Sequence, residues 1–358
     1  MSATEGTDRP PRIALVLGSG GIVGGAYHAG VLKALNDTWG VDPRAVDVIV
    51  GTSAGSIAGA LTAAGLHPND LFRREIGQPL SPAGQAILAR GRATGGRRPR
   101  TMSAVGVPAA PQALLSAIAR PTEVAAGSVA AAFLPRGVTS TDHLAGWIDG
   151  LLGPEWPNGP HLRIAAVELA SARRVVFTTA GDDDHHDDLD SRARRVATTP
   201  GTAVAASCAV PSVFAPVAIG DREYIDGGVH SADNLDLVGT DAYDLVVVSS
   251  PMSASQPLSG GLSLLAVRQL SRIQTARERR SLGPIGHVEI LRPTPADLDA
   301  MGSNMLDPRR RPAVAHQAHA SACTRLGRRP SPLAAGPSGD VDTTTARTTA
   351  PRSRIMAS

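Results

Sequence analysis

The chain has 358 residues, of which 42% are hydrophobic and 19% charged, so it can form a sizeable core and is not disordered as a whole. Only 3% of its residues are aromatic and its formal net charge is +3, which argues against a nucleic-acid-binding protein. Its two cysteines are too few for a disulfide framework or a structural zinc site.

The N-terminal segment, residues 1–11, is polar, and no run of roughly 18 apolar residues occurs along the chain. We therefore expect a disordered N-terminus, no signal peptide and no membrane-spanning helix. The sequence predicts a cytoplasmic protein whose contact with a membrane is peripheral and transient. The sequence carries no signal of the oligomeric state.

The first predicted strand, residues 13–17, is a run of leucine and β-branched residues that stops at a glycine-rich turn, Gly18-Ser-Gly-Gly21. A helix is predicted over 26–36. A second strand over 46–50 runs through another glycine turn into a helix over 56–64. Two such units close together indicate a parallel sheet with helices on its faces, and therefore an α/β fold.

Residues 67–140 differ in character, being rich in alanine and weakly periodic, and residues 91–100 combine arginine with glycine and proline. This composition predicts a less regular, lid-like insertion on the surface. Its arginines are candidates for contact with anionic lipid headgroups, although a solvated, flexible face is the simpler interpretation.

Strand patterns return after the insertion, at 162–169, 174–179, 193–199, 214–219, 223–225, 245–249 and 288–291. Helices are predicted around residue 204 and over 264–278 and 312–326. After residue 327 the chain consists mainly of proline, serine, threonine and arginine, which predicts a disordered tail over 328–358. The folded domain is thus expected to span residues 12–327.

Gly51-Thr-Ser53-Ala-Gly55 has the G-x-S-x-G spacing of a nucleophile elbow, and it lies between a predicted strand and a helix as that turn requires. The glycines on either side remove side chains that would collide in so tight a turn. A helix N-terminus behind Ser53 also favours a developing oxyanion. The alternative is that Ser53 merely caps this helix, as serine often does.

Gly18-Ser-Gly-Gly21 fits neither of two common nucleotide-binding patterns. The dinucleotide fingerprint needs a glycine where Val23 stands, and a phosphate-binding P-loop needs a lysine that is absent here. The segment is therefore either a purely structural turn or a turn whose free backbone N–H groups hold an oxyanion.

Asp226-Gly227-Gly228 is ordinarily the signal of a hairpin turn. Beside a nucleophilic serine it has a second interpretation, in which a carboxylate at a strand end acts as the general base. Direct activation of this kind requires only that the two oxygens come within hydrogen-bond distance.

A Ser–His–Asp esterase of the α/β-hydrolase type would need a histidine after the acid. Four candidate histidines follow Asp226, and none of them lies in a segment that the sequence predicts as a catalytic loop: His230, His287, His316 and His319. That fold also places several strands before its nucleophile, whereas Ser53 follows the second, so a dyad without histidine fits better.

Two further segments have simpler explanations than catalysis. The acidic run at 182–188 has consecutive residues with no spacing that would bring ligands together, so we interpret it as a solvated hairpin loop and not as a metal site. Cys208 lies in a run of small apolar residues and is predicted to be a buried, inert thiol.

Three blocks taken together resemble the patatin-like phospholipase family. Residues 15–33 resemble its glycine-rich oxyanion loop and the helix that follows, and residues 50–56 its nucleophile elbow. Residues 206–214 followed by 224–229 are similar to the block that ends in the catalytic Asp-Gly-Gly. The blocks occur in the family's order, and the resemblance covers residues 13–250 with a gap in the middle.

The resemblance implies a three-layer α/β sandwich with a mostly parallel central sheet, and a serine lipid acyl hydrolase that needs no metal or cofactor. Ser53 would attack the ester carbonyl, Asp226 would take its proton, and backbone N–H groups of Gly20, Gly21 and Ala54 would hold the oxyanion. The other motif glycines would support these turns: Gly18, Gly51, Gly55, Gly227 and Gly228. The implied partner is a lipid or fatty-acyl ester, and the alternative is a catalytically silent lipid-binding protein of the same fold.

One position departs from the family pattern. The family's loop carries Arg or Lys just before its last glycine, where this chain has Val23 or Gly24, depending on the register. Gly20 and Gly21 match loop glycines in either register. Backbone amides can stabilise an oxyanion without that cation, so the expected mechanism is unchanged.

Overall fold

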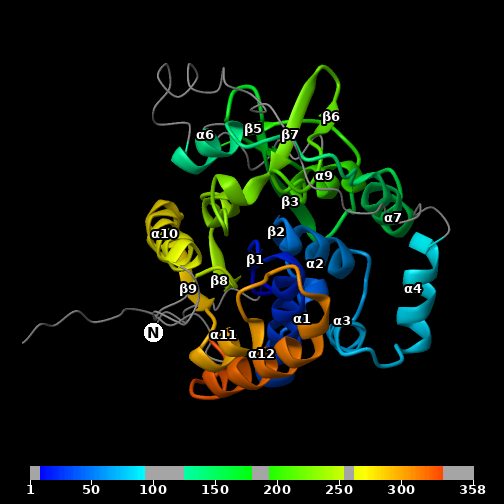
Figure 1. Ribbon diagram of the computed structural model, residues 1–358. Coiled ribbons are helices and arrows are strands. Elements are labelled where there is room, and N and C mark those ends of the chain that lie inside the picture. The colour runs from blue at the N-terminus through cyan, green and yellow to red at the C-terminus, as the bar shows by residue number, and fades with distance from the viewer. Residues whose placement is uncertain (1–8, 93–124, 180–192, 254–261, 334–358) are drawn as a thin grey trace, which may run out of the picture.

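The computed structural model describes residues 9–92, 125–179, 193–253 and 262–333 (Figure 1). Its strands are β1 (Ile13–Leu17), β2 (Val48–Thr52), β3 (His161–Glu168), β4 (Arg174–Phe177), β5 (Arg194–Arg195), β6 (Val217–Ile219), β7 (Arg222–Asp226), β8 (Tyr243–Ser249) and β9 (Ile285–Leu291). Its α-helices are α1 (Gly21–Trp39), α2 (Ala54–Ala63), α3 (Pro68–Glu75), α4 (Pro82–Arg92), α6 (Ala126–Ala132), α7 (Asp142–Leu152), α9 (Pro200–Ser207), α10 (Leu262–Glu278), α11 (Pro295–Met301) and α12 (Arg311–Leu326).

The nine strands of the described residues form one sheet, in which seven follow the order β5-β4-β3-β2-β1-β8-β9, while β7 pairs with β3 and β6 pairs with β7. Pairing is parallel from β3 across to β9, and β4 and β7 are both antiparallel to β3. The predicted α/β fold with a mostly parallel central sheet is therefore confirmed.

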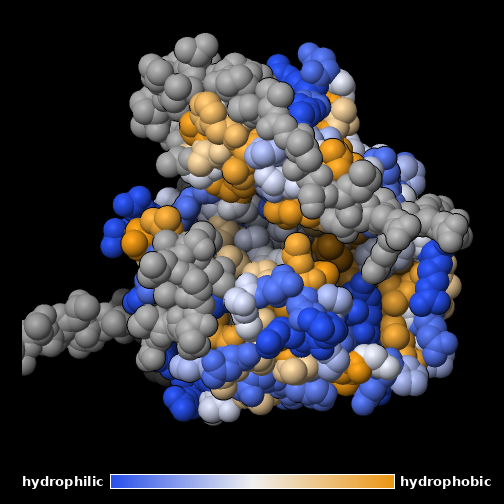
Figure 2. All heavy atoms as spheres, in the orientation of Figure 1, coloured by the Kyte–Doolittle hydropathy of each residue, from blue (hydrophilic) through white to orange (hydrophobic). Residues whose placement is uncertain are grey.

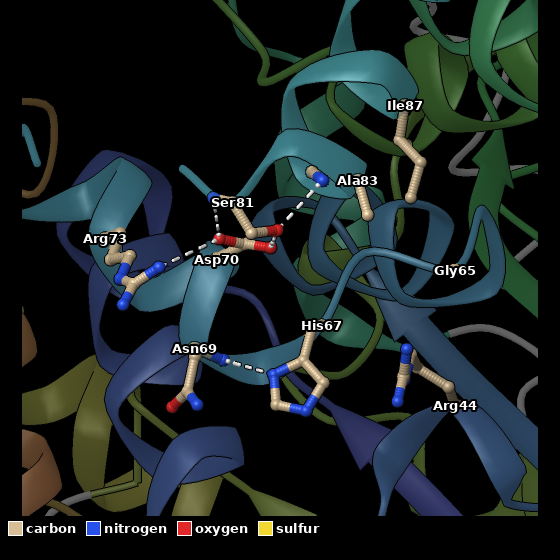
Figure 3. A pocket seen from close by; sticks show the side chains of 10 residues that line it. Arg44, Gly65, His67, Asn69, Asp70, Arg73, Ser81, Ala83 and Ile87 are labelled. Carbon is tan, nitrogen blue, oxygen red and sulfur yellow. Dashed lines mark hydrogen bonds and ion pairs between the residues drawn. The ribbon is translucent and has the colours of Figure 1, made fainter. Parts of the chain in front are cut away.

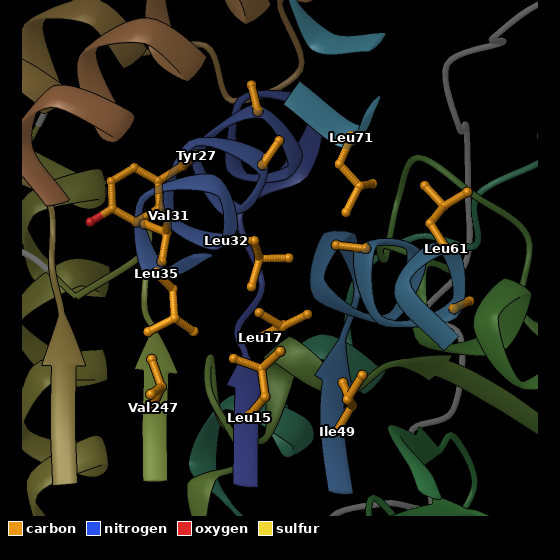
Figure 4. Close-up of a cluster of buried hydrophobic side chains, with 14 of the residues drawn as sticks. Leu15, Leu17, Tyr27, Val31, Leu32, Leu35, Ile49, Leu61, Leu71 and Val247 are labelled. Carbon is orange, nitrogen blue, oxygen red and sulfur yellow. The ribbon is translucent and has the colours of Figure 1, made fainter. Parts of the chain in front are cut away.

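The core lies on both faces of this sheet because successive side chains of a strand point to opposite sides. Leu15 and Leu17 of β1 belong to the larger cluster with side chains of α1 and α2 (Figure 4), and α12 adds to this cluster from the outer side of α1. Ala14 and Val16 belong to a second cluster on the opposite face, together with the 3₁₀ segment η4 (Leu235–Val238). Strands buried on both sides explain the uninterrupted apolar runs in the sequence.

Most predicted strands are confirmed, with boundaries shifted by a few residues, but four elements differ from expectation. The strand predicted over 193–199 is reduced to the two residues of β5. Helix α1 begins at Gly21 and not at Ala26, because the glycine-rich segment itself continues as helix after Gly20. Helices α7 and α11 were not predicted; each is short and buries only two or three side chains.

The insertion, expected to be less regular, contains helices within residues 68–92 and 126–132, while residues 133–141 form no helix. Helices α3 and α4 lie within 68–92, each beginning with a proline that is tolerated in a first turn. Residues 93–124, which hold most of the arginine-rich stretch, lie outside the described residues, as do the acidic loop at 182–188 and residues 334–358.

The described part of the N-terminal segment is attached to the sheet. Arg9 forms an ion pair with Asp244 at 3.0 Å, and the backbone N–H of Arg12 donates to the same carboxylate at 2.7 Å. Within the described ranges, no helix has the length and apolar character needed to cross a membrane.

Candidate active site

Ser53 connects β2 to α2 in a strained backbone conformation, with φ 53° and ψ −119°. A left-handed φ is unusual for serine and is typical of strained turns at functional sites. The turn is also tight, since a Cβ on Gly55 would lie 1.9 Å from the carbonyl oxygen of Leu17. The Ser53 side chain makes no capping hydrogen bond, so its interpretation as a simple helix cap is wrong.

The sheet brings Ser53 and Asp226 together by register. Thr52, the last residue of β2, pairs with Ala165 of β3, and Asp226, the last residue of β7, pairs with Ala166. Because β4 occupies the other edge of β3, the ends of β2 and β7 meet head to head along one edge. The Ser53 side chain lies near enough to the Asp226 carboxyl group to lower the pKa of that group.

Asp226 is buried, and burial raises the pKa of its carboxyl group from 3.8 to about 6. Hydrogen bonds from the Ser53 side chain and the Gly228 N–H, the latter 2.7 Å long, oppose this rise because they stabilise the carboxylate. A carboxyl group with a pKa of about 6 is still ionised at neutral pH, and its carboxylate is a stronger base than that of an exposed aspartate.

The C-terminal end of α9 holds both residues in place. The Ser53 N–H donates to the Ser207 hydroxyl at 2.9 Å, and the Cys208 thiol donates to the Ser53 carbonyl at 3.3 Å. One residue further, the carbonyl of Ala209 accepts from the Asp226 N–H at 3.0 Å. Burial raises the pKa of the Cys208 thiol, as expected of an inert cysteine.

The glycine-rich loop after β1 lies against the same two turns. The N–H groups of Gly18 and Ser19 are bonded to the carbonyls of Ser249 and Ala232, which fixes the start of the loop. By contrast, the N–H groups of Gly20, Gly21 and Ala54 have no acceptor among the described residues. Gly21 has φ +60°, a conformation that favours glycine.

Neighbouring atoms confirm that the loop and the two turns meet. A Cβ on Gly55 would lie 2.7 Å from the Gly18 carbonyl, and a Cβ on Gly228 would lie 3.2 Å from the Ser19 hydroxyl. Figure 2 shows the surface hollowed where Figure 1 places the carboxyl ends of β1 and β2, beside α10. This is where ligands bind in open parallel sheets.

The family model of patatin-like phospholipases matches residues 15–238, more than half of the chain. The chain belongs to the patatin-like phospholipase family. Membership supports lipid acyl hydrolysis as its activity. No curated protein matches the chain.

Among solved structures, the chain is similar to VipD from Legionella pneumophila, with 13% identity and a TM-score of 0.40, over 88% of this chain and 67% of that one. It is also similar to the type III effector protein ExoU, with 17% identity and a TM-score of 0.33, over 89% of this chain and 53% of ExoU. A third match is the ExoU–SpcU heterodimer from the type III secretion system of Pseudomonas aeruginosa, with 17% identity and a TM-score of 0.32. This match covers 89% of this chain and 52% of the matched one. The chain thus spans about half the length of the ExoU structures.

Two residues that support this patatin-like site were not identified from the sequence. The Asn234 side chain donates to the Thr52 hydroxyl at 3.1 Å and to the Gly227 carbonyl at 3.4 Å, so it joins the two strand ends. The buried His28 ring bridges the Gly18 carbonyl at 2.7 Å and the Ser249 hydroxyl at 2.8 Å. Burial lowers the pKa of His28 to about 4, which keeps this bridge neutral.

No histidine hydrogen-bonds to Ser53 in the part of the chain that the structure describes. His287 contacts Glu289, and His319 contacts Asp37. His230 follows the Asp226 turn, but burial and the nearby Arg174 lower its pKa to about 3. The described ranges also contain no cluster of three acidic, histidine or cysteine side chains suited to a metal ion.

A separate pocket of about 320 Å³ lies between α3 and α4 (Figure 3). Its charged groups already have partners: Asp70 accepts from the Ser81 hydroxyl at 2.5 Å and pairs with Arg73, and Arg44 pairs with Asp42. None of the predicted catalytic residues lines it. We regard it as a structural feature of the insertion.

Proposed function

We propose that the chain hydrolyses fatty-acyl ester bonds of phospholipids or related lipids through a Ser53–Asp226 dyad and an acyl-enzyme. The observation that carries the proposal is the meeting of β2 and β7 on β3, which places Ser53 beside the buried carboxyl group of Asp226. Membership of the patatin-like family supports the lipid substrate.

In this mechanism Asp226 accepts the hydroxyl proton while the Ser53 Oγ attacks the ester carbonyl. The tetrahedral intermediate collapses to an acyl-serine, and the proton passes from Asp226 to the departing alcohol. Water then attacks the acyl-serine, again giving its proton to Asp226, and Ser53 recovers a proton as the fatty acid leaves.

The oxyanion in each half-reaction is assigned to the N–H groups of Gly20, Gly21 and Ala54. They have no acceptor among the described residues, and they lie at the first turns of α1 and α2, where the helix dipole favours negative charge. Removing one such donor typically costs about 10²–10³ in rate.

A fluorophosphonate probe tests the proposal without knowledge of the lipid, because it captures any activated serine. We expect the wild-type protein to be labelled, Ser53→Ala to be unlabelled, and Asp226→Asn to be labelled at least about 10³-fold more slowly. Ser321→Ala, which alters a serine of α12, is the matched control and should be labelled normally.

Two results would overturn the proposal. Absence of labelling in a well-folded wild-type protein would favour a catalytically silent lipid-binding protein. A double variant much slower than either single variant in hydrolysis of an acyl ester would show that Ser53 and Asp226 do not act as one unit.

A further inference from the structure

Helix α10 has an unusual distribution of side chains. From residue 268 onward its buried side chains are all polar, and they recur at helical spacing: Arg268, Ser271, Thr275 and Glu278. Its outer face exposes apolar side chains, with Leu270 65% exposed and Ile273 49% exposed. A surface helix normally shows the opposite pattern, so the inner face of residues 268–278 serves something other than apolar packing.

The polar groups further along this inner face have protein partners. Thr275 donates to the Asp233 carboxylate at 2.5 Å, and Glu278 accepts from the Leu235 N–H at 2.9 Å. Arg268 differs, because among the described residues its guanidinium hydrogen-bonds only to the Met305 sulfur, 3.8 Å from Nη2, and to no oxygen acceptor.

Arg268 is only 4% exposed, and it contrasts with the two other buried arginines among the described residues. Arg163 donates to the carbonyls of Leu237 and Val238, and Arg174 pairs with Asp236 at 2.5 Å. A buried cation without a carboxylate or oxygen acceptor is strongly unfavourable. In agreement with this, burial alone lowers the pKa of Arg268.

One residue, Met305, contacts both Arg268 and the oxyanion loop. The carbonyl of Met305 accepts from the Val23 N–H at 3.2 Å, and it lies 2.7 Å from where a Gly21 Cβ would be. The unpaired guanidinium therefore lies next to the loop that faces the ester, and this loop itself carries no arginine or lysine.

We propose that Arg268 binds the phosphate group of a phospholipid substrate, so that it selects phospholipids over neutral acyl esters. This inference rests on the proposed function and assigns the substrate class of that same site. The guanidinium fork matches two phosphate oxygens, and the phosphodiester supplies the negative charge that the buried cation lacks.

The test compares two substrates with the same acyl chains, dioleoylphosphatidylglycerol and dioleoylglycerol, in the same detergent micelles. Arg268→Gln is expected to lower the ratio of kcat/KM for the phospholipid to that for the neutral lipid by about 10–100-fold, as loss of a charge-assisted hydrogen bond predicts. Arg272→Gln lies one turn further on the exposed face and should leave the ratio unchanged. An equal loss on both substrates, or no change, would overturn the proposal.

A thermal melt with and without inorganic phosphate gives a readout independent of turnover. Removing an uncompensated charge should raise the Tm of Arg268→Gln above that of the wild type, and phosphate should raise the Tm of the wild type alone. Stabilisation by phosphate with an unaltered substrate ratio would mean a site for free phosphate and would contradict headgroup binding. Fluorophosphonate labelling of Arg268→Gln separates the proposed dyad from the proposed role of Arg268. If the variant is still labelled and its kcat/KM ratio for the two lipids is unchanged, only the role of Arg268 is overturned.

Discussion

The carboxyl group of Asp226 is placed where a carboxylate is costly. Burial raises its pKa from 3.8 to about 6, and the hydrogen bonds from Ser53 and Gly228 do not fully compensate for the lost hydration. In the proposed mechanism a base that was easier to ionise would hold the serine proton less well, so the unfavourable burial would favour catalysis.

This pKa predicts the dependence of activity on pH. Because the base must be ionised, kcat/KM should be half-maximal near pH 6 and fall about tenfold per unit below it. The measurement is hydrolysis of a neutral acyl ester between pH 4.5 and 8, with unfolding monitored at each pH. A profile that stays flat down to pH 5 would contradict the role of Asp226 as base.

The same shift predicts a gain in stability when the charge is removed. The folded protein holds this proton up to about pH 6 and the unfolded chain only up to about 3.8, so the fold loses stability as the pH rises between these values. Asp226→Asn should therefore be more stable than the wild type at pH 8, by up to about 3 kcal/mol, and about equal at pH 4. Urea unfolding at the two pH values measures this, and an equal difference at both would contradict it.

At the scale of single residues, the sequence predicted only those that belong to a local motif. Ser53 lies in a G-x-S-x-G turn and Asp226 in an Asp-Gly-Gly turn, so each has neighbours that mark it. Asn234, Ser207 and Arg268 act through contacts with residues distant in sequence, and their own neighbours form no pattern. Such roles depend on tertiary packing.

Among the elements, α9 has the closest connection to the candidate chemistry. Its last turn fixes the backbone of Ser53 through the Ser207 hydroxyl and that of Asp226 through the Ala209 carbonyl. The turns that carry Ser53 and Asp226 lie on different strands. A rigid helix end that contacts both turns therefore holds their relative positions.

Loss of the Ser207 hydroxyl should therefore lower kcat more than it raises KM. Ser207→Ala leaves the Ser53 N–H without a partner, and we expect kcat to fall about tenfold. Thr62→Ala is the matched control, because it removes a buried hydroxyl of α2 whose bond to Ala58 lies one to two turns from Ser53. If both variants lost the same activity, the effect would be general destabilisation.

Element types were predictable where one periodicity extends over several residues, as in the buried strands β1, β2 and β8. Boundaries were not, because turns such as the one at Ser53 allow a helix to begin directly after a strand. Helices α7 and α11 escaped prediction since short helices with few buried residues carry little periodic signal.

Across the whole molecule, the first helix depends on the last one described. Helix α1 is buried on nearly all sides, between the sheet and α12. The two helices approach closely, since a Cβ on Gly30 would lie 2.6 Å from the Ala315 carbonyl, and the Trp39 indole donates to the Leu326 carbonyl at 3.1 Å. The segment matched by the family model, 15–238, does not include α12.

Truncation tests this dependence. A chain ending at Arg310 lacks α12 and would expose the apolar face of α1, so we expect it to aggregate or to lose its cooperative unfolding transition. A chain ending at Leu333 keeps every described contact of α12 and is the matched control. Circular dichroism melts and gel filtration measure the outcome, and a monomeric, cooperatively folded chain ending at Arg310 would contradict the expectation.

The packing of α1 on α12 also has a consequence for biosynthesis. Trp39 and the carbonyl that it contacts are 287 residues apart, and β1 pairs with β8 across more than two hundred residues of intervening chain. During translation β1 and α1 therefore leave the ribosome long before these partners are synthesised. Until α12 emerges, the growing chain presents apolar surface from α1, and chaperones are expected to hold it throughout that time.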